Sequence, residues 1–394
     1  MNTHTIWDIL LKSSTNTRTN TGSVDEAALV KLFDELPRIP GIARETLRDF
    51  SAQTLGVPAT EISLKGVREL NTEGSKGFSG APLYLIFDPS GKKVGVIKVF
   101  PWSGGYGPKG FVMELSALER LGKKEFDTFQ VTNLLGVAKA LTADGEVGVL
   151  LTSVALGQPF DNLMFAVRDG FSPQARQNAL QDLHHAVAAT GQLLAELHSK
   201  PSGSGDPVSQ QQVSKHVAVM QGSLDFIQAR AEEIGIQLEI KELRTMVNEL
   251  ISNFKHHPGG SALVHGDPNP GNFLYHPTFG ITIIDASSLH SSMNAHGNPI
   301  GCPAADLARF ENGLLRYGEL FDKEVDQLRV TFRQAYQAGK GAQITNEARR
   351  FFDVQTMLGD LIACLLEDEP LLEEIDKQVE RIRTRMRRAK GACV

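Results

Sequence analysis

Residues 263–287, LVHGDPNPGNFLYHPTFGITIIDAS, decide the fold that this sequence predicts. The stretch contains the pattern D-x-x-x-x-N, formed by Asp267 and Asn272, and then two short apolar segments that end at Asp285. Phosphoryl transfer from Mg·ATP needs oxygen-rich side chains that hold the metal ions and a carboxylate beside the incoming hydroxyl. These three residues supply both kinds of group at a spacing that suits the reaction.

The order and spacing also follow the protein-kinase pattern, with HGD in place of HRD and Asp-Ala-Ser in place of DFG. We therefore predict a catalytic loop and a hairpin of two strands, FLYH and ITIID, around the turn PTFG. In this interpretation Asp267 faces the acceptor hydroxyl, Asn272 offers its carbonyl oxygen to a metal ion, and Asp285 bridges metal and phosphates. A lone HGD arises by chance and an aspartate at a strand end often caps a turn, so the argument also depends on upstream features.

A glycine-rich segment lies upstream between two predicted strands. The first strand starts near Ile62, NTEGSKGFSG separates it from APLYLIFD, and the turn PSGK leads into VGVIKVF. Glycine lets backbone N–H groups approach phosphate oxygens without an intervening side chain. The residues available for phosphate binding are Gly74, Gly77, Ser79 and Gly80. Glycine-rich hairpins without a ligand are also common, so the loop alone leaves both interpretations open.

Lys98 lies inside the apolar third strand, as V-I-K-V. A buried lysine carries a desolvation cost unless an anion meets it, which favours pairing with nucleotide phosphates and a carboxylate of the next helix. The period of two along a strand equally permits an outward-facing lysine. In the predicted helix FVMELSALERL, Glu114 shares a face with Leu118 and Leu121, so we predict it as the partner of Lys98, whereas Glu119 is predicted to be solvated.

The remaining sequence predicts three parts. Residues 1–60 form a helical N-terminal extension of unassigned role, residues 61–152 a small nucleotide-binding lobe, and residues 153–394 a large helical lobe that holds the catalytic loop and the acceptor. The apolar run before Gly157 is either an inter-lobe linker whose backbone binds adenine near residues 151–154 or a plain core strand. Helical periodicity marks residues 175–198 and, as one or two helices, residues 213–254.

Composition excludes several classes of protein. Hydrophobic residues make up 41% and charged residues 22%, which is ordinary for a globular chain, and the net charge of -6 offers no general attraction to nucleic acid. The three cysteines, Cys302, Cys364 and Cys393, are widely spaced, which argues against a disulfide framework and fits a reducing compartment. No apolar run approaches the length of a membrane span, so a cytoplasmic location is predicted.

Together these segments resemble a known family. VHGDPNPGN, IID, PAADLA, ELSALERL, GFSGAPLY and LLTSVALGQPF, within residues 62–310, are similar to motifs of the aminoglycoside phosphotransferase and choline kinase group of the protein-kinase-like superfamily. The resemblance implies an α+β, bilobal fold with a mainly β small lobe, a mainly helical large lobe and Mg·ATP, hence ATP and Mg2+, in the cleft. It implies a catalytic role for Asp267, metal roles for Asn272 and Asp285, and phosphate anchoring by Lys98 and Glu114. His265 and Asp306 match positions that support the loop.

The acceptor is the open question. The main hypothesis is a kinase that phosphorylates a hydroxyl (alcohol) group of a small molecule such as an aminoglycoside, sugar or amino alcohol. The alternatives are a protein-modifying kinase, which would use residues 1–60 for docking a partner or host protein, and a non-catalytic nucleotide-binding pseudokinase. The acidic run that includes Glu367, Asp368, Glu369, Glu373, Glu374 and Asp376 is predicted as a solvated helix end rather than an acceptor site. The basic RIRTRMRRAK is predicted as a solvent-facing helix paired with that acidic run.

Overall fold

A computed structural model describes residues 34–66, 82–101, 107–122, 126–170, 172–199, 207–285, 300–315, 318–367 and 371–387. These residues belong to two compact units. The first, called the sheet unit, takes in the described residues up to Asp161 together with 274–285. The second, called the helical unit, takes in residues 162–273 and the described residues from 300 onward. The architecture is α+β, as the sequence predicts.

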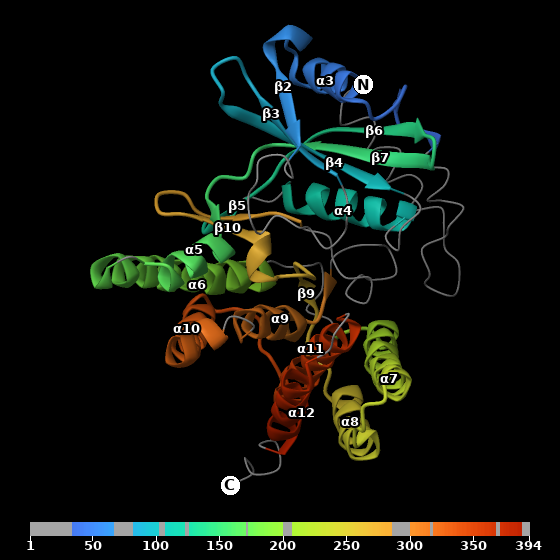
Figure 1. The fold of residues 1–394 in the computed structure, drawn as a ribbon, viewed down its shortest axis with the longest axis vertical. Coiled ribbons are helices and arrows are strands. Elements are labelled where there is room, and N and C mark those ends of the chain that lie inside the picture. Colours follow the sequence, from blue (N-terminus) through green and yellow to red (C-terminus); the bar gives the residue numbers. More distant parts are fainter. Residues whose placement is uncertain are drawn as a thin grey trace. The chain divides into compact units, whose positions relative to one another are not determined.

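The sheet unit is built on a six-stranded sheet in the order β1-β6-β7-β4-β3-β2 (Figure 1). Neighbouring strands are antiparallel, except that β1 pairs in parallel with β6. The Asp88 side chain closes the turn between β3 and β4, because it accepts hydrogen bonds from the N–H groups of Ser90 and Lys92. The predicted strands on either side of PSGK are confirmed. The elements are β1 (Arg38–Ile39), α3 (Arg44–Leu55), η1 (Ala59–Glu61), β2 (Ser63–Gly66), β3 (Leu83–Phe87), β4 (Lys93–Pro101), α4 (Gly107–Gly122), β6 (Leu134–Thr142) and β7 (Gly145–Thr152).

Helices cover both faces of this sheet, with α3 on one side and α4 on the other (Figure 1). Ile97 and Val99 of β4 belong to the core that includes Leu47 of α3. On the opposite face the ring of Phe111 in α4 packs over Gly148 of β7, where an added Cβ would collide with the ring. Because both faces are buried, the strands read as apolar runs rather than as a strict alternation. The helix predicted from FVMELSALERL is α4.

The N-terminal part of the described chain is built into the same core. Its β1 adds a strand to the sheet, and α3 packs so closely on β6 that a Cβ at Gly136 would lie 2.8 Å from the Thr54 side chain. Gly56 ends α3 in the left-handed conformation, which explains why the helix stops there. This helix lies within residues 1–60, for which the sequence predicts helical structure.

A second, four-stranded sheet in the order β5-β11-β10-β8 carries the predicted hairpin. FLYH forms β10 and most of ITIID forms β11, so both strand predictions are confirmed. The hairpin is anchored on both sides, because β11 pairs in parallel with β5 and β10 pairs with β8. Asp285 lies two residues after the end of this anchored hairpin. The strands are β5 (Phe129–Val131), β8 (Gln158–Pro159), β10 (Phe273–His276) and β11 (Gly280–Ile283).

In the helical unit, a large apolar core lies among α7, α8, α9, α11 and α12. Phe254 stacks on Phe351 with ring centroids 4.1 Å apart, and Phe352 meets both rings edge-on. The helix expected over residues 175–198 is α6, and residues 213–254 form two helices, α7 and α8. No helix in the described ranges is long and apolar enough to cross a membrane. The elements are α5 (Phe160–Arg168), α6 (Pro173–Ser199), α7 (Gln210–Glu233), α8 (Ile240–His256), β9 (Ala262–Leu263), η3 (Pro270–Asn272), β12 (Ile300–Gly301), α9 (Pro303–Leu315), α10 (Gly318–Ala338), α11 (Asn346–Leu366) and α12 (Leu372–Arg387).

The prediction for the basic C-terminal segment is wrong in its details. The segment belongs to α12, but that helix buries Ile375 and Ile382 completely and is therefore not simply solvent-facing. Two of its arginines pair outside the acidic run: Arg383 contacts Glu239 and Glu242 at the start of α8, and Arg385 contacts Asp353 of α11. Charge alone gave no sign of the apolar stripe between the arginines. Asp368, Glu369, Cys393 and residues 388–390 lie outside the described residues.

Candidate active site

Lys98 is the centre of an ion cluster in the sheet unit. Its Nζ lies 2.8 Å from Oε2 and 3.1 Å from Oε1 of Glu114, and 2.6 Å from Oδ1 of Asp285. The side chains of Lys98 and Glu114 are only 12% and 6% exposed, whereas Asp285 is 43% exposed. The predicted Lys98–Glu114 pair is therefore present, and one oxygen-rich side chain of the cluster faces solvent.

Strand alternation places Lys98 on the face that α4 covers. Its neighbours Ile97 and Val99 point into the opposite core and are 0% and 1% exposed. The ammonium also lies 4.9 Å from the ring centroid of Phe100, the next residue on its own face. The outward-facing alternative for Lys98 is thus excluded. One strand and one helix fix the lysine and the glutamate.

The charges of this cluster depend on one another. Burial lowers the pKa of Lys98, but the carboxylates of Glu114 and Asp285 outweigh burial, so the pKa of Lys98 lies above its usual value. Burial, and to a lesser degree the charge of Asp285, raises the pKa of Glu114 against the opposing effect of Lys98. Lys98 is therefore a fixed cation at neutral pH. A fixed cation beside an exposed carboxylate is suited to phosphate and metal.

Asp285 adopts an unusual backbone conformation, with φ at 49°. Aspartate tolerates the left-handed region better than most residues, but such a conformation costs on the order of 1–3 kcal/mol and tends to occur at functional sites. The anchored hairpin and the contact with Lys98 hold the residue there. The conformation turns the chain just after β11 at the predicted metal ligand.

The catalytic loop in the helical unit is organised around the Asp267 carboxylate. The amide of Asn269 donates to its Oδ1 at 2.5 Å. The amide of Asn272 donates to the Asp267 carbonyl at 2.7 Å and lies 3.4 Å from Oδ2. Because the Asn272 nitrogen faces Asp267, its carbonyl oxygen is left to accept from, or bind to, another group. This is the orientation that a metal ligand requires.

A buried network holds this loop from behind. Asp306 of α9 is completely buried and accepts hydrogen bonds from the backbone N–H groups of His265 and Gly266, at 2.7 and 2.9 Å. His198 of α6 contacts the same carboxylate through Nε2 at 3.1 Å, and its Nδ1 lies 3.0 Å from the Tyr336 hydroxyl. Asp306 thus supports the loop, as expected for it. His198 and Tyr336 were not predicted, because they lie far apart in sequence.

Arg309 is a third residue that the sequence did not predict. Its Nε lies 2.7 Å from Oδ1 of Asp267. Arg309 follows Asp306 by one turn of α9, so both face the loop. One turn further on, Gly313 packs on Pro270, where an added Cβ would collide with the proline ring. The spacing of Asp306 and Arg309 within PAADLARF indicates that they share one face of a helix. This spacing points to Arg309 only once the catalytic loop is known to lie against that face.

Other predictions concern the nucleotide. Gly74, Gly77, Ser79 and Gly80 lie outside the described residues. In the proposed adenine linker, Leu151 pairs within β7, and the N–H of Ser153 already donates to the carbonyl of Asn133 at 2.8 Å. That N–H is therefore not free for adenine. The side chain of Glu119 also lies outside the described part.

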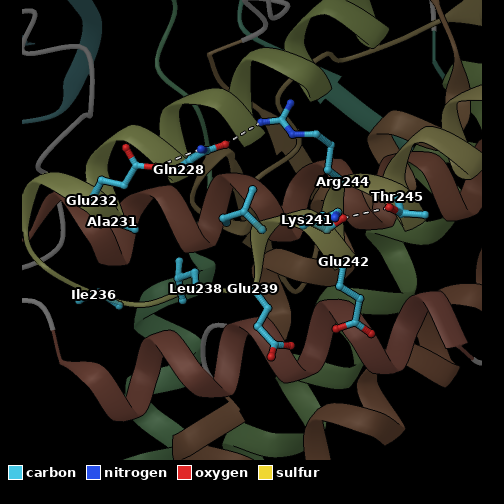
Figure 2. Close-up of a pocket in the computed structure, with 11 residues that line it drawn as sticks. Gln228, Ala231, Glu232, Ile236, Leu238, Glu239, Lys241, Glu242, Arg244 and Thr245 are labelled. Atoms are coloured by element: carbon cyan, nitrogen blue, oxygen red, sulfur yellow. Dashed lines mark hydrogen bonds between the residues drawn. The ribbon is translucent and has the colours of Figure 1, made fainter.

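A large open pocket of about 710 Å³ lies elsewhere, along α7 and α8 (Figure 2). Several of its polar side chains are already hydrogen-bonded: Arg244 donates to Gln228, which donates to Glu232. Glu239 and Glu242 on its other side pair with Arg383. No residue of the catalytic loop lines it. Size alone therefore does not make this pocket the acceptor site.

Comparison with known proteins places the fold. No protein-family model and no curated protein matches the sequence. Among solved structures, a glucosamine kinase is similar at 13% identity, over 89% of this chain and 84% of that one, with a TM-score of 0.52. The chain has a protein-kinase-like fold.

Two further solved structures are similar to this chain. A glucosamine kinase in complex with glucosamine, ADP and inorganic phosphate is similar at 14% identity, over 90% of this chain and 84% of that one, with a TM-score of 0.52. An aminoglycoside phosphotransferase from Streptomyces rimosus has 16% identity, covering 79% of this chain and 98% of that one, with a TM-score of 0.45. The glucosamine kinase structures confirm the fold that the motifs predict. At these identities the comparisons identify no substrate.

Proposed function

We propose that this protein is an ATP-dependent phosphotransferase that moves the γ-phosphoryl group to a hydroxyl of a small molecule. The observation that carries the proposal is the ion cluster of Lys98, Glu114 and Asp285, with its buried cation and its exposed carboxylate. A structural ion pair has no need of a third, solvent-facing carboxylate in a left-handed conformation. A site for phosphate and metal needs both the buried cation and the exposed carboxylate.

In the proposed reaction Lys98 neutralises phosphate charge, and Glu114 holds the lysine in position. The carboxylate of Asp285 and the carbonyl of Asn272 would hold Mg2+, and the donor atoms fit, because both are oxygens that a hard cation prefers. The bound metal would neutralise charge that develops on the phosphates. The second glucosamine kinase structure is a complex with ADP, which also supports a nucleotide as the phosphoryl donor here.

Asp267 orients the acceptor hydroxyl for attack in line with the γ-phosphorus. A bond forms between the hydroxyl oxygen and that phosphorus as the bond to the bridging oxygen of ADP breaks. The hydroxyl proton passes to Asp267 and then to solvent. Positioning and electrostatics supply most of the acceleration in this class of reaction. The clamp by Asp306 and the contacts of Asn269 and Asn272 fix the Asp267 carboxylate for this task.

We assign residues 61–152 to nucleotide binding and 153–394 to catalysis and acceptor binding. A small-molecule acceptor is favoured because the similar solved structure with the bound sugar is itself a small-molecule kinase. A protein acceptor is the second candidate. The described N-terminal residues do not favour it, because they pack into the core of the sheet unit and leave less of the extension for docking.

The test measures ADP release with ATP and Mg2+ across a panel of sugars, amino alcohols, hydroxy acids and aminoglycosides. At least one compound should stimulate ADP release in the wild type and not in Asp267→Asn. Radiolabel transfer to proteins of a lysate, abolished by the same substitution, would indicate the protein-modifying alternative instead. Nucleotide binding with neither kind of transfer would leave a pseudokinase and refute the proposal.

A further inference from the structure

The charge beside Asp267 bears on the kind of acceptor, an inference that rests on the proposed function. Oδ1 of Asp267 is already engaged by the amide of Asn269 and by Arg309. Among the residues that the structure describes, Oδ2 is contacted by the Asn272 amide, at the longer distance of 3.4 Å. The incoming hydroxyl therefore meets Oδ2, and it arrives next to the guanidinium of Arg309.

Arg309 is held in this place by its helix. Asp306, one turn earlier in α9, is clamped to the loop backbone, and Gly313, one turn later, packs on Pro270. The cation is thus a fixed part of the site rather than a mobile surface charge. Its Nε is covered, whereas the side chain as a whole is 31% exposed. The accessible surface of the side chain therefore belongs to atoms other than Nε, and the two Nη groups of the guanidinium are N–H donors.

Glu311, the acidic residue that follows Arg309 in α9, does not offset this cation. Glu311 is 1% exposed and contacts three arginines, Arg329, Arg333 and Arg349. An acceptor that carries an ammonium group beside its reacting hydroxyl would be repelled by the guanidinium of Arg309 at close range.

We propose that Arg309 is an acceptor-binding residue and that the acceptor carries an anionic group, a carboxylate or a phosphate, close to the reacting hydroxyl. The planar guanidinium matches both groups, because two parallel N–H donors meet two oxygens. Arg309 then lies between the acceptor anion and the Asp267 carboxylate, so that its positive charge separates the two negative groups. Polycationic acceptors such as aminoglycosides are disfavoured.

The experiment uses acceptors with one carbon skeleton and different charge: glucose, gluconate, glucose 6-phosphate and glucosamine. Calorimetric binding to the full chain with ADP and Mg2+ is measured first, because it does not require turnover, and kcat/KM follows. Gluconate or glucose 6-phosphate should bind with an affinity at least about tenfold higher than that of glucose, and glucosamine should bind most weakly. Whichever anion binds better identifies carboxylate or phosphate as the recognised group.

Three variants test the residue itself. Arg309→Gln should reduce the preference for the anionic member over glucose at least tenfold, chiefly through KM, and Arg309→Lys should restore part of it. Arg176→Gln, at an exposed arginine of α6, is the control and should keep the preference. Stronger binding of glucose or glucosamine, no binding of either anion, or a preference unchanged in Arg309→Gln would overturn the proposal. The proposed function fails separately, if ADP does not bind or no Asp267-dependent transfer occurs.

Discussion

Replacing Lys98 separates what the ion cluster does for stability from what it does for function. Lys98→Met removes the cation and leaves the Glu114 carboxylate, 6% exposed, without the partner that lies 2.8 Å away. Breaking one side of a buried pair in this way costs about 3–5 kcal/mol. The second variant, Lys98→Met with Glu114→Leu, removes both charges and should recover most of that loss, because an apolar pair of similar volume is often at least as stable.

The pH dependence of the single variant has a definite sign. Burial already raises the pKa of Glu114 above its usual value of 4.5, and loss of Lys98 raises it further. Between 4.5 and the raised pKa the folded state binds more protons than the unfolded state, so stability falls as pH rises. The deficit of Lys98→Met is therefore complete above the raised pKa and shrinks as the pH falls toward 4.5.

The assay is urea unfolding of the wild type and the two variants from pH 4.5 to 8, with phosphoryl transfer measured beside it at neutral pH. Both variants should lose transfer, although the double variant regains stability. The reasoning is refuted if the single variant is as stable as the wild type at neutral pH. It is equally refuted if the double variant regains activity together with stability, since the lysine would then have only a structural role.

Further substitutions test the supports of the site. Gly148→Val should push Phe111 and α4 off the sheet, costing about 1–3 kcal/mol and raising the KM for ATP. The control Gly222→Ala in α7, where an added Cβ meets nothing within 4 Å, should leave that KM unchanged. Asp306→Asn places an amide N–H against a backbone N–H and should lower stability by about 3–5 kcal/mol together with kcat; unchanged unfolding would exclude the clamp. Glu311→Gln should lower the free energy of unfolding by roughly 3 kcal/mol at neutral pH. Burial raises the pKa of Glu311, but Arg349, Arg333 and Arg329 outweigh burial and hold that pKa at about 2. This contribution is present above 4.5 and is lost as the pH falls toward 2, so the difference from wild type must narrow in acid.

The sequence predicted the parts of the site that local patterns encode. Asp267, Asn272 and Asp285 stand in one short stretch, and the hairpin between the last two has clear strand signals on both sides of a turn. The Lys98–Glu114 pair was predicted because strand and helix periods each indicate a face, although only the structure excludes an outward-facing lysine.

What the sequence could not predict depends on contacts between distant segments. His198 and Tyr336 are separated by 138 positions and meet only because α6 and α10 pack together. The strand β1 is two residues long and flanked by prolines, so it has no periodic signal, yet it extends the sheet. The same holds for Arg309, whose position in a helix says nothing about Asp267 until the loop is placed.

The central claim is that Asp267 orients an acceptor hydroxyl for phosphoryl transfer, and single-turnover transfer from labelled ATP tests it most directly. The measurement compares wild type with Asp267→Asn at saturating ATP, Mg2+ and acceptor, with Asp326→Asn, an 80% exposed aspartate of α10, as the matched control. We expect Asp267→Asn to bind ADP normally but to slow transfer by roughly 10²–10⁴-fold, with the control unchanged. Transfer within a few-fold of wild type in Asp267→Asn would contradict the account.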